Sequence, residues 1–365
     1  MKKLLLAVFS IATTFSLYAQ REVPQERMEQ IYEEVKTPYK YGLAVAPADN
    51  YHKIDCPTVF RQGDKWLMTY VVYNGKGGTD GRGYETWIAE SDNLLEWRTL
   101  GRVLSYRDGK WDCNQRGGFP ALPDMEWGGS YELQTYKGRH WMTYIGGEGT
   151  GYEAVKAPLY VGLAWTKGDI STAHEWESLD KPILSIHDKD AQWWEKLTQY
   201  KSTVYWDKDK TFVMYYNAGG RHPETDLKGE RVGIALSKDM KTWKRYSGNP
   251  VFAHEADGTI TGDAHIQKMG DVYVMFYFSA FEPSRKYKAF NTFAASYDLV
   301  NWTDWKGADL IIPSKNYDEL FAHKSYVVKH DGVVYHFYCA VNNAEQRGIA
   351  IATSKPMGRS AVRFP

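Results

Sequence analysis

Short strand-like runs of apolar residues, each paired with a second run across a tight turn, recur along most of this chain. The first pair covers residues 53–73, where Gln62-Gly63-Asp64 separates one run from Lys65–Tyr73, which is rich in aromatic and β-branched residues. Gly and Asp at such a turn are typical of β-hairpins. The pattern predicts an all-β protein built from repeated hairpins. Comparable second strands follow at Trp141–Ile145, Phe212–Asn217, Tyr273–Phe278 and Tyr335–Val341.

A second recurrence follows these hairpins. A strand with small residues, such as Val161–Ala164, leads to a strand that carries a tryptophan, and a fifth copy begins at Gly348–Ser354 without one. The separations of 79, 67 and 59 residues indicate loops of different length on a constant unit of four strands. Five units that bury their faces only against neighbours predict a five-bladed β-propeller. The tryptophans are Trp97, Trp176, Trp243 and Trp302.

The missing strand of the fifth unit has a candidate near the other end of the chain. Tyr39–Ala46 is strand-like and would close the ring by joining the last blade. We therefore expect a single propeller domain over residues 38–365. Two packed sheets, as in a lectin-like sandwich, are the alternative, but that arrangement does not explain a fivefold unit.

The segment before the propeller predicts one helix. Residues 20–37 place Met28, Ile31, Tyr32 and Val35 on one helical face. A helix that is apolar on one side must cover something, so we expect it to brace the propeller.

The first residues are typical of a targeting signal. A basic start at Lys2-Lys3 precedes the apolar run Leu4–Leu17, and a small residue, Ala19, follows. We expect residues 1–19 to form a signal peptide cleaved after Ala19, and the protein to be periplasmic or secreted. The alternative is a membrane anchor, for which the run is short.

The composition narrows the possible partners. Lys plus Arg and Asp plus Glu both number 45, so nothing favours a nucleic acid or a membrane surface. The 27 Tyr and 14 Trp would suit the faces of sugars, although aromatic residues are also common in strands. Three Cys without a CxxC spacing predict neither a disulfide scaffold nor a thiolate metal site, and we expect no metal or cofactor.

The first strand of each blade lines the central channel of a propeller, so the residues that open these strands converge. Three of the five positions carry a carboxylate, which is costly in a buried strand unless it is paired or used. The alternative is a set of internal salt bridges, for example Asp55 with Lys201 or Lys324. The positions are Asp55, Tyr131-Glu132, Lys201-Ser202, Asp263-Ala264-His265 and His323-Lys324.

Paired carboxylates across a sugar-sized cavity are the machinery of glycoside cleavage. One must be ionised, and the other must be protonated to give its proton to the leaving oxygen. Nearby charges and burial can separate two such pKa values. The cationic or titratable groups available for this tuning are Lys201, Lys324, His265 and His323.

The loop of residues 109–129 is the longest insertion in the first half of the chain. Its Arg116 could bind a sugar hydroxyl or carboxylate, and its Trp111 or Trp127 could form a stacking wall. The alternative is a loop packed on itself. If phosphate were the nucleophile, Arg221, Arg285 and His323 would be the cations to bind it.

The blade pattern and the motif Asp55-Cys56-Pro57 resemble the glycoside hydrolase superfamily that includes families 43, 32, 117 and 130. In family 43 an acid directly precedes the proline, whereas one residue intervenes here. The resemblance implies that Asp55 is the general base of an inverting enzyme. It also implies a general acid on a later blade, for which Asp263 is the first candidate and Glu132 the second. Lys201 stands where the family has an Asp.

These features together predict an exported glycoside hydrolase that acts from the chain end on a plant or algal oligosaccharide. Two alternatives stay open: a glycoside phosphorylase on the same scaffold, and a carbohydrate-binding propeller without activity. The sequence leaves the sugar, the linkage and the oligomeric state open.

Overall fold

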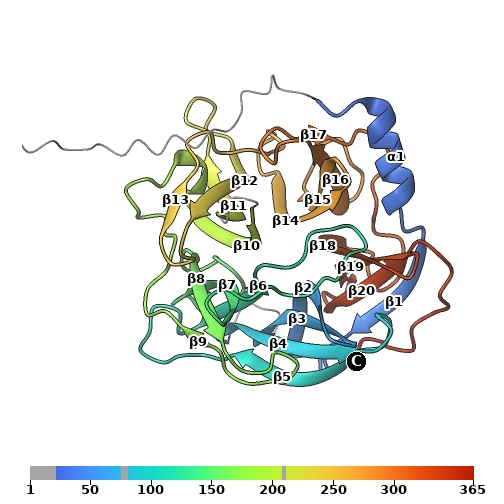
Figure 1. The fold of residues 1–365 in the computed structure, drawn as a ribbon, viewed down its shortest axis with the longest axis horizontal. Coiled ribbons are helices and arrows are strands. Elements are labelled where there is room, and N and C mark those ends of the chain that lie inside the picture. Colours follow the sequence, from blue (N-terminus) through green and yellow to red (C-terminus); the bar gives the residue numbers. More distant parts are fainter. Residues whose placement is uncertain (1–21, 75–80, 208–210) are drawn as a thin grey trace, which may run out of the picture.

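The computed structural model describes residues 22–74, 81–207 and 211–365, which form an almost entirely β structure with one α-helix (Figure 1). The predicted signal peptide, residues 1–19, lies outside the described residues. In the described part, the strands group into five four-stranded units arranged around a common centre. The third and fourth units are counted as one sheet because a single parallel bridge, between Glu230 and Ile260, joins them.

The first three blades follow each other along the sequence. Blade one holds β2 (His52–Gln62), β3 (Lys65–Asn74), β4 (Gly83–Ser91) and β5 (Arg98–Leu104). Blade two holds β6 (Gln115–Pro120), β7 (His140–Gly147), β8 (Tyr160–Thr166) and β9 (Glu177–Ser178). Blade three holds β10 (Thr198–Trp206), β11 (Phe212–Arg221), β12 (Lys228–Ser237) and β13 (Trp243–Arg245), preceded by the 3₁₀-helix η2 (Trp193–Glu195).

The last two blades complete the ring. Blade four holds β14 (Ile260–Met269), β15 (Val272–Ala280), β16 (Ala289–Ser296) and β17 (Thr303–Asp304). Blade five holds β18 (Phe321–His330), β19 (Val333–Val341), β20 (Arg347–Thr353) and β1 (Tyr39–Val45). The antiparallel pairing of β1 with β20 confirms the predicted ring closure by the amino-terminal strand.

The helix α1 (Gln25–Val35) lies at the outer side of the fourth and fifth blades (Figure 1). Its buried face, Met28, Ile31 and Val35, belongs to the same apolar cluster as residues of those two blades. Tyr32 stacks on Trp305 with the ring centres 5.1 Å apart. The helix is therefore a brace, as its pattern predicts. No helix among the described residues has the length and apolar character to cross a membrane.

The inner strand of the second blade differs from the prediction. It is β6, whereas Tyr131-Glu132 lies in a later excursion whose backbone bridges to Arg61. Two glycines allow β6 to enter this crowded position, since a Cβ on Gly118 would lie 2.4 Å from the Met142 sulfur. Glu132 is exposed, so the prediction that it opens an inner strand is wrong.

The inner strands of the other four blades share one irregularity. The pairing of β2, β10, β14 and β18 with its neighbour shifts register just where the predicted channel residues lie. At three of these sites a residue other than glycine has a positive φ: Cys56 (53°), Asp263 (58°) and Lys324 (60°). Bulges of this kind re-aim side chains. Here they turn polar groups of four blades towards the channel.

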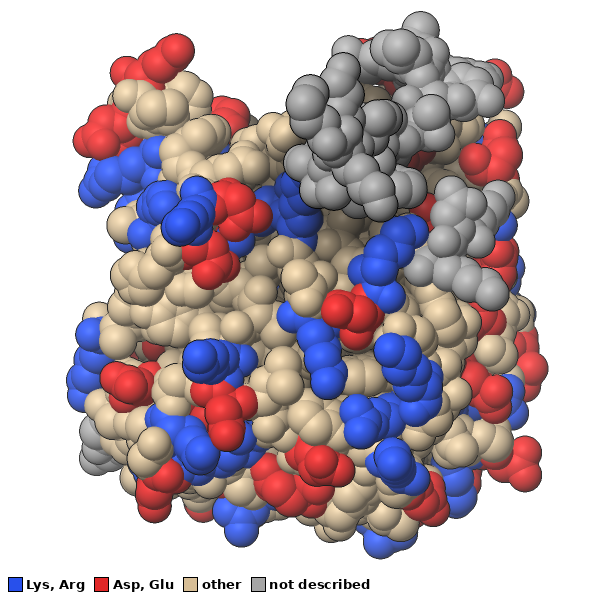
Figure 2. Space-filling view, turned by 60° about the vertical axis from the view of Figure 1, so that its left-hand side comes forward, with Lys and Arg blue, Asp and Glu red and all other residues tan. Residues whose placement is uncertain are grey.

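The outer surface carries both signs of charge. Figure 2 shows basic and acidic residues intermixed over one face of the molecule, which agrees with the equal numbers of the two kinds. No broad field of one sign is visible on this face.

Candidate active site

A cavity of about 250 Å³ lies where the five blades meet, and every blade contributes to its lining. A pocket of this volume is at the small end for ligand sites. Its walls are aromatic and apolar on one side and strongly charged on the other. The charged and amide groups are Glu153, Lys201, Asn217, Glu230, Asp263, His323, Lys324 and Arg347.

Glu230 is the carboxyl group whose surroundings most favour the protonated form. It lies on β12 beside the bridge to β14, and one of its oxygens, Oε2, accepts a hydrogen bond from Asn217 Nδ2 at 3.1 Å. Burial, together with the negative charges of Glu153 and Asp263, raises the pKa of Glu230 to about 8. Glu230 therefore carries a proton at neutral pH.

Glu153 faces the same cavity from the loop that joins β7 to β8. Its Oε1 accepts a hydrogen bond from the Lys324 ammonium group at 3.1 Å. Its backbone has a φ of 46°, which a residue other than glycine adopts only where the surrounding structure holds it. A carboxylate paired with a cation thus stands opposite a protonated carboxyl group.

Asp263 is the third acid of the cavity and is almost completely buried. Burial raises the pKa of Asp263, although Lys201 at 3.8 Å and Lys324 act in the opposite direction. The amide of Asn217 links this residue to Glu230, because its Oδ1 accepts the Asp263 backbone N–H at 3.3 Å. Asp263 therefore lies where the sequence places it, beside a different acid from the one expected.

Asp55 is fully buried and is not among the lining residues. Its Oδ2 accepts hydrogen bonds from Lys324 at 2.8 Å, Arg347 at 2.9 Å and the Tyr73 hydroxyl. Burial alone would raise the pKa of Asp55, but Lys324 and Arg347 hold it well below its usual range. The geometry matches the salt-bridge alternative, with Lys324 as the partner.

Lys324 therefore joins two carboxylates. Burial alone would lower the pKa of its ammonium group, but the negative charges around it, Asp55 first, raise it well above the usual range. The same ammonium group contacts Glu153 on the cavity side. Asp55 thus fixes the cation that holds Glu153.

The remaining predicted residues divide into two groups. Lys201, His323 and Lys324 line the cavity. His265 is buried beside the channel, where its Nε2 lies 2.9 Å from the Val327 carbonyl and its ring stacks on Tyr326. Burial lowers the pKa of His265 to about 3, so the ring is neutral, and it does not line the cavity.

The three residues predicted to bind substrate from the loop 109–129 are structural instead. Arg116 is completely buried and pairs with Asp112 and Glu175. Trp111 stacks on Tyr144, and Trp127 donates a hydrogen bond to Glu34 of α1. The loop packed on itself, the alternative for this segment, is the one observed. None of the three lines the cavity.

One group of described residues has the spacing of a metal site: Asp55, His323 and Cys339, whose ligand atoms lie within 4.8 Å of one another. The donor set does not suit a further cation, because Lys324 and Arg347 already contact the Asp55 carboxylate. All three cysteines, Cys56, Cys113 and Cys339, are free thiols.

The mouth of the cavity is aromatic. Phe281 is 51% exposed, and its ring meets the edge of Phe321 with centres 6.2 Å apart. Lys288 lies over the other ring, with its Nζ 5.6 Å from the centre of Phe321. An exposed aromatic rim beside a charged cavity offers a stacking surface for the part of a ligand that extends outside.

Sequence reasoning missed both glutamates and the rim. Glu153 lies in a loop without periodicity, so nothing in the pattern marks it. Glu230 directly precedes the recognisable third strand of blade three, and a charged residue entering a buried strand was the available signal.

No family model matches the sequence, and no curated protein matches it. A solved structure described as a complex of BT0996 with RGII is 95% identical, covers 94% of this protein and 99% of its own length, and has a TM-score of 0.93. Another, described as "Glycoside hydrolase", is 94% identical with the same coverage and TM-score. A family 117 glycoside hydrolase of Zobellia galactanivorans is 12% identical over 88% of this protein and 91% of its own length, with a TM-score of 0.60, and shares the fold.

Proposed function

This protein belongs to the glycoside hydrolases, and from this premise we propose that it removes a terminal sugar from a plant oligosaccharide of the RGII type. Glu230 is the proton donor of this reaction, and Glu153 is its ionised partner. The observation that carries the proposal is the difference between these two carboxyl groups. They share one small cavity, and their surroundings favour opposite protonation states.

Such a pair meets the requirement of glycosidic cleavage. Glu230 gives its proton to the glycosidic oxygen as the bond from that oxygen to the anomeric carbon breaks, and the bonding electrons stay on the oxygen. In the inverting reaction expected from the sequence, Glu153 takes a proton from a water molecule whose oxygen bonds to the anomeric carbon. The proton returns from Glu153 to Glu230 through solvent before the next turnover.

The cations of the cavity keep this arrangement. Lys324 holds Glu153 by a direct hydrogen bond, and Lys201 lies 3.8 Å from Asp263. Glu230 has no ion pair with any described residue, and its contact with the neutral amide of Asn217 leaves its proton available. Positioned general acids and bases typically contribute about 10² to 10⁴ in rate.

The shape of the cavity supports action at the end of a saccharide. About 250 Å³ offers room for little more than one sugar unit, and the aromatic rim of Phe281 and Phe321 lies where the leaving part of the substrate would emerge. The rest of the oligosaccharide therefore stacks outside the cavity.

The two alternatives from the sequence receive less support. For phosphorolysis, Arg221 pairs with Asp226 and Arg285 pairs with Asp309, so of the three expected cations His323 alone lines the cavity. A propeller that only binds sugars would need its carboxylates locked in salt bridges. Asp55 is locked in this way, whereas Glu230 is not.

Export of the protein belongs to the same proposal, because a polysaccharide-degrading enzyme meets its substrate outside the cytoplasm. The basic and apolar residues at positions 2–17 support it. Fractionation of cells that produce the full-length protein should place it in the periplasm or the medium, shortened by 19 residues.

The test compares hydrolysis by Glu153→Gln, Glu230→Gln and Glu224→Gln, the last being an exposed carboxylate outside the cavity. We expect release of one monosaccharide from an RGII oligosaccharide by the wild type, unchanged rates for Glu224→Gln, and losses of about 10² to 10⁴ for the other two. Proton NMR of the first product gives its anomeric configuration. Full activity of either cavity variant would refute its role.

A further inference from the structure

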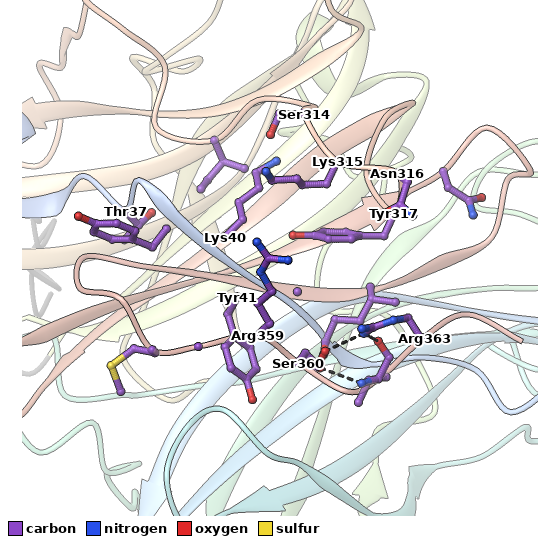
Figure 3. A pocket seen from close by; sticks show the side chains of 18 of the residues that line it. Thr37, Lys40, Tyr41, Ser314, Lys315, Asn316, Tyr317, Arg359, Ser360 and Arg363 are labelled. Atoms are coloured by element: carbon purple, nitrogen blue, oxygen red, sulfur yellow. Dashed lines mark hydrogen bonds between the residues drawn. The ribbon is translucent and has the colours of Figure 1, made fainter.

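A second and larger cavity, of about 1010 Å³, lies on the fifth blade away from the carboxyl groups. It is bounded by β1, by the residues 310–317 and by the carboxy-terminal residues 356–364 (Figure 3). It shares no lining residue with the candidate active site.

The charge of this cavity is one-sided. Four basic residues line it, and the described lining residues include no Asp or Glu, although the whole protein has equal numbers of both signs. Lys315 and Arg359 are exposed and have no ion pair with any described residue. The four are Lys40, Lys315, Arg359 and Arg363, and Figure 3 shows them around the ring of Tyr317.

A buried carboxylate beneath the cavity holds one wall in place. Asp318 accepts the backbone N–H groups of Ser314 at 2.9 Å and Lys315 at 2.8 Å, and the Tyr338 hydroxyl at 2.8 Å. It also pairs with Lys40, and its side chain has no exposure. Asp318 therefore compensates Lys40 while fixing the loop that presents Lys315.

The opposite wall is fixed by the carboxy-terminal segment. The Ser360 N–H donates to the Tyr41 carbonyl at 2.9 Å, and the Ser360 hydroxyl donates to the Leu43 carbonyl. Gly42, with a φ of 126°, allows this close approach, because a Cβ there would lie 3.0 Å from the Ser360 Cβ. The cations thus stand on two anchored segments.

Like charges are close in this cavity. Burial first, and the neighbouring Lys315 among the other groups, lowers the pKa of Lys40, although its partner Asp318 acts in the opposite direction. Uncompensated cations at such a distance favour a bound anion, and charge-assisted hydrogen bonds to a carboxylate are among the strong ones. Tyr39, which is 46% exposed, and Tyr317 add aromatic faces on which a sugar ring can stack.

We propose that this cavity is a second saccharide-binding site, selective for sugars that carry a carboxylate, with Lys315 and Arg359 as the principal anion ligands. The inference deepens the proposed function and rests on it for the class of ligand. The site holds an acidic part of the polysaccharide on the outer side of blade five while another end of the polysaccharide occupies the active site. This raises the local concentration of substrate without taking part in cleavage.

The test measures binding of a galacturonate trisaccharide to the full-length protein by isothermal titration calorimetry, with a neutral galactose trisaccharide and an acidic peptide of equal charge as comparisons. We expect the acidic saccharide alone to bind. Lys315→Glu and Arg359→Glu should each weaken binding about tenfold or more, and added salt should weaken binding to the wild type. Lys189→Glu, an exposed lysine outside both cavities, is the matched control.

Equal binding of the neutral trisaccharide, binding of the peptide alone, or unchanged affinity in Lys315→Glu and Arg359→Glu would overturn the proposal. The titration needs no turnover. Failure of the proposed function, which is an absence of hydrolysis of the RGII oligosaccharide by the wild type, is therefore read independently of this result.

Discussion

Replacement of Glu230 by Gln should separate the protonation of this residue from every other property of the cavity. Glutamine has nearly the same shape, and its carbonyl oxygen can still accept the hydrogen bond from Asn217. It stays neutral at every pH, whereas the wild-type residue, with a pKa raised from 4.5 to about 8, must lose a proton on unfolding between these values. Stability of the wild type therefore falls as pH rises from about 4.5 to 8, while that of the variant does not follow this slope.

The size of the effect follows from the pKa shift. The difference of 8 − 4.5 is 3.5 units, which corresponds to about 5 kcal/mol at 1.36 kcal/mol per unit. Glu230 keeps some contact with solvent in the open cavity, and screening reduces this value. We expect Glu230→Gln to gain about 3 kcal/mol relative to the wild type between pH 5 and pH 9.

The assay is urea unfolding of both proteins at pH 5, 7 and 9, followed by tryptophan fluorescence, with Glu224→Gln as the control. Activity supplies the second readout, because the wild-type kcat/KM should fall above about pH 8 as the acid loses its proton. A stability difference that is the same at pH 5 and pH 9 would refute the raised pKa, and with it the assignment of Glu230 as proton donor.

Three further substitutions test other parts of the structure. Asp55→Asn leaves Lys324 and Arg347 without their shared anion and should cost about 3 to 5 kcal/mol in thermal unfolding; a variant that is fully stable but inactive would instead restore Asp55 as the general base. Phe281→Ala should raise KM for the oligosaccharide several-fold while leaving inhibition by the released monosaccharide unchanged, and equal changes in both would contradict an outer stacking role. Ile31→Ala should destabilise the protein by about 2 to 5 kcal/mol with unchanged kcat, and an unchanged melting temperature would show that α1 is not a brace.

The propeller could be predicted because its blades are alike in sequence. Hairpin turns and tryptophan strands are local patterns, and a repeat of local patterns constrains the whole ring. The turns repeat even in detail: the Ser237 hydroxyl accepts the backbone N–H groups of Asp239 and Met240, and Ser91 and Ser296 accept equivalent bonds in their blades. The exception was β6, whose paired glycines carry no apolar alternation.

The site was less predictable because its chemistry depends on contacts between blades. Asp55 was a sound candidate by position, yet its partners Lys324 and Arg347 come from strands almost 300 residues further along the sequence. Whether a carboxylate is locked or free is decided by such partners and not by its own segment. Glu153 shows the same limit from the other side, since its loop becomes part of the cavity through Lys324.

The backbone of the inner strands explains why the charged groups gather where they do. Cys56, Asp263 and Lys324 have left-handed conformations that cost about 1 to 3 kcal/mol each for residues other than glycine. All three lie at register shifts and all three line the cavity. A regular strand would alternate its side chains between the two faces of the blade, whereas the bulge turns the side chains of Asp263 and Lys324 towards the cavity. The strain is therefore tied to the placement of charge, and it is held by ion pairs such as Lys324 with Asp55, which lies directly before Cys56.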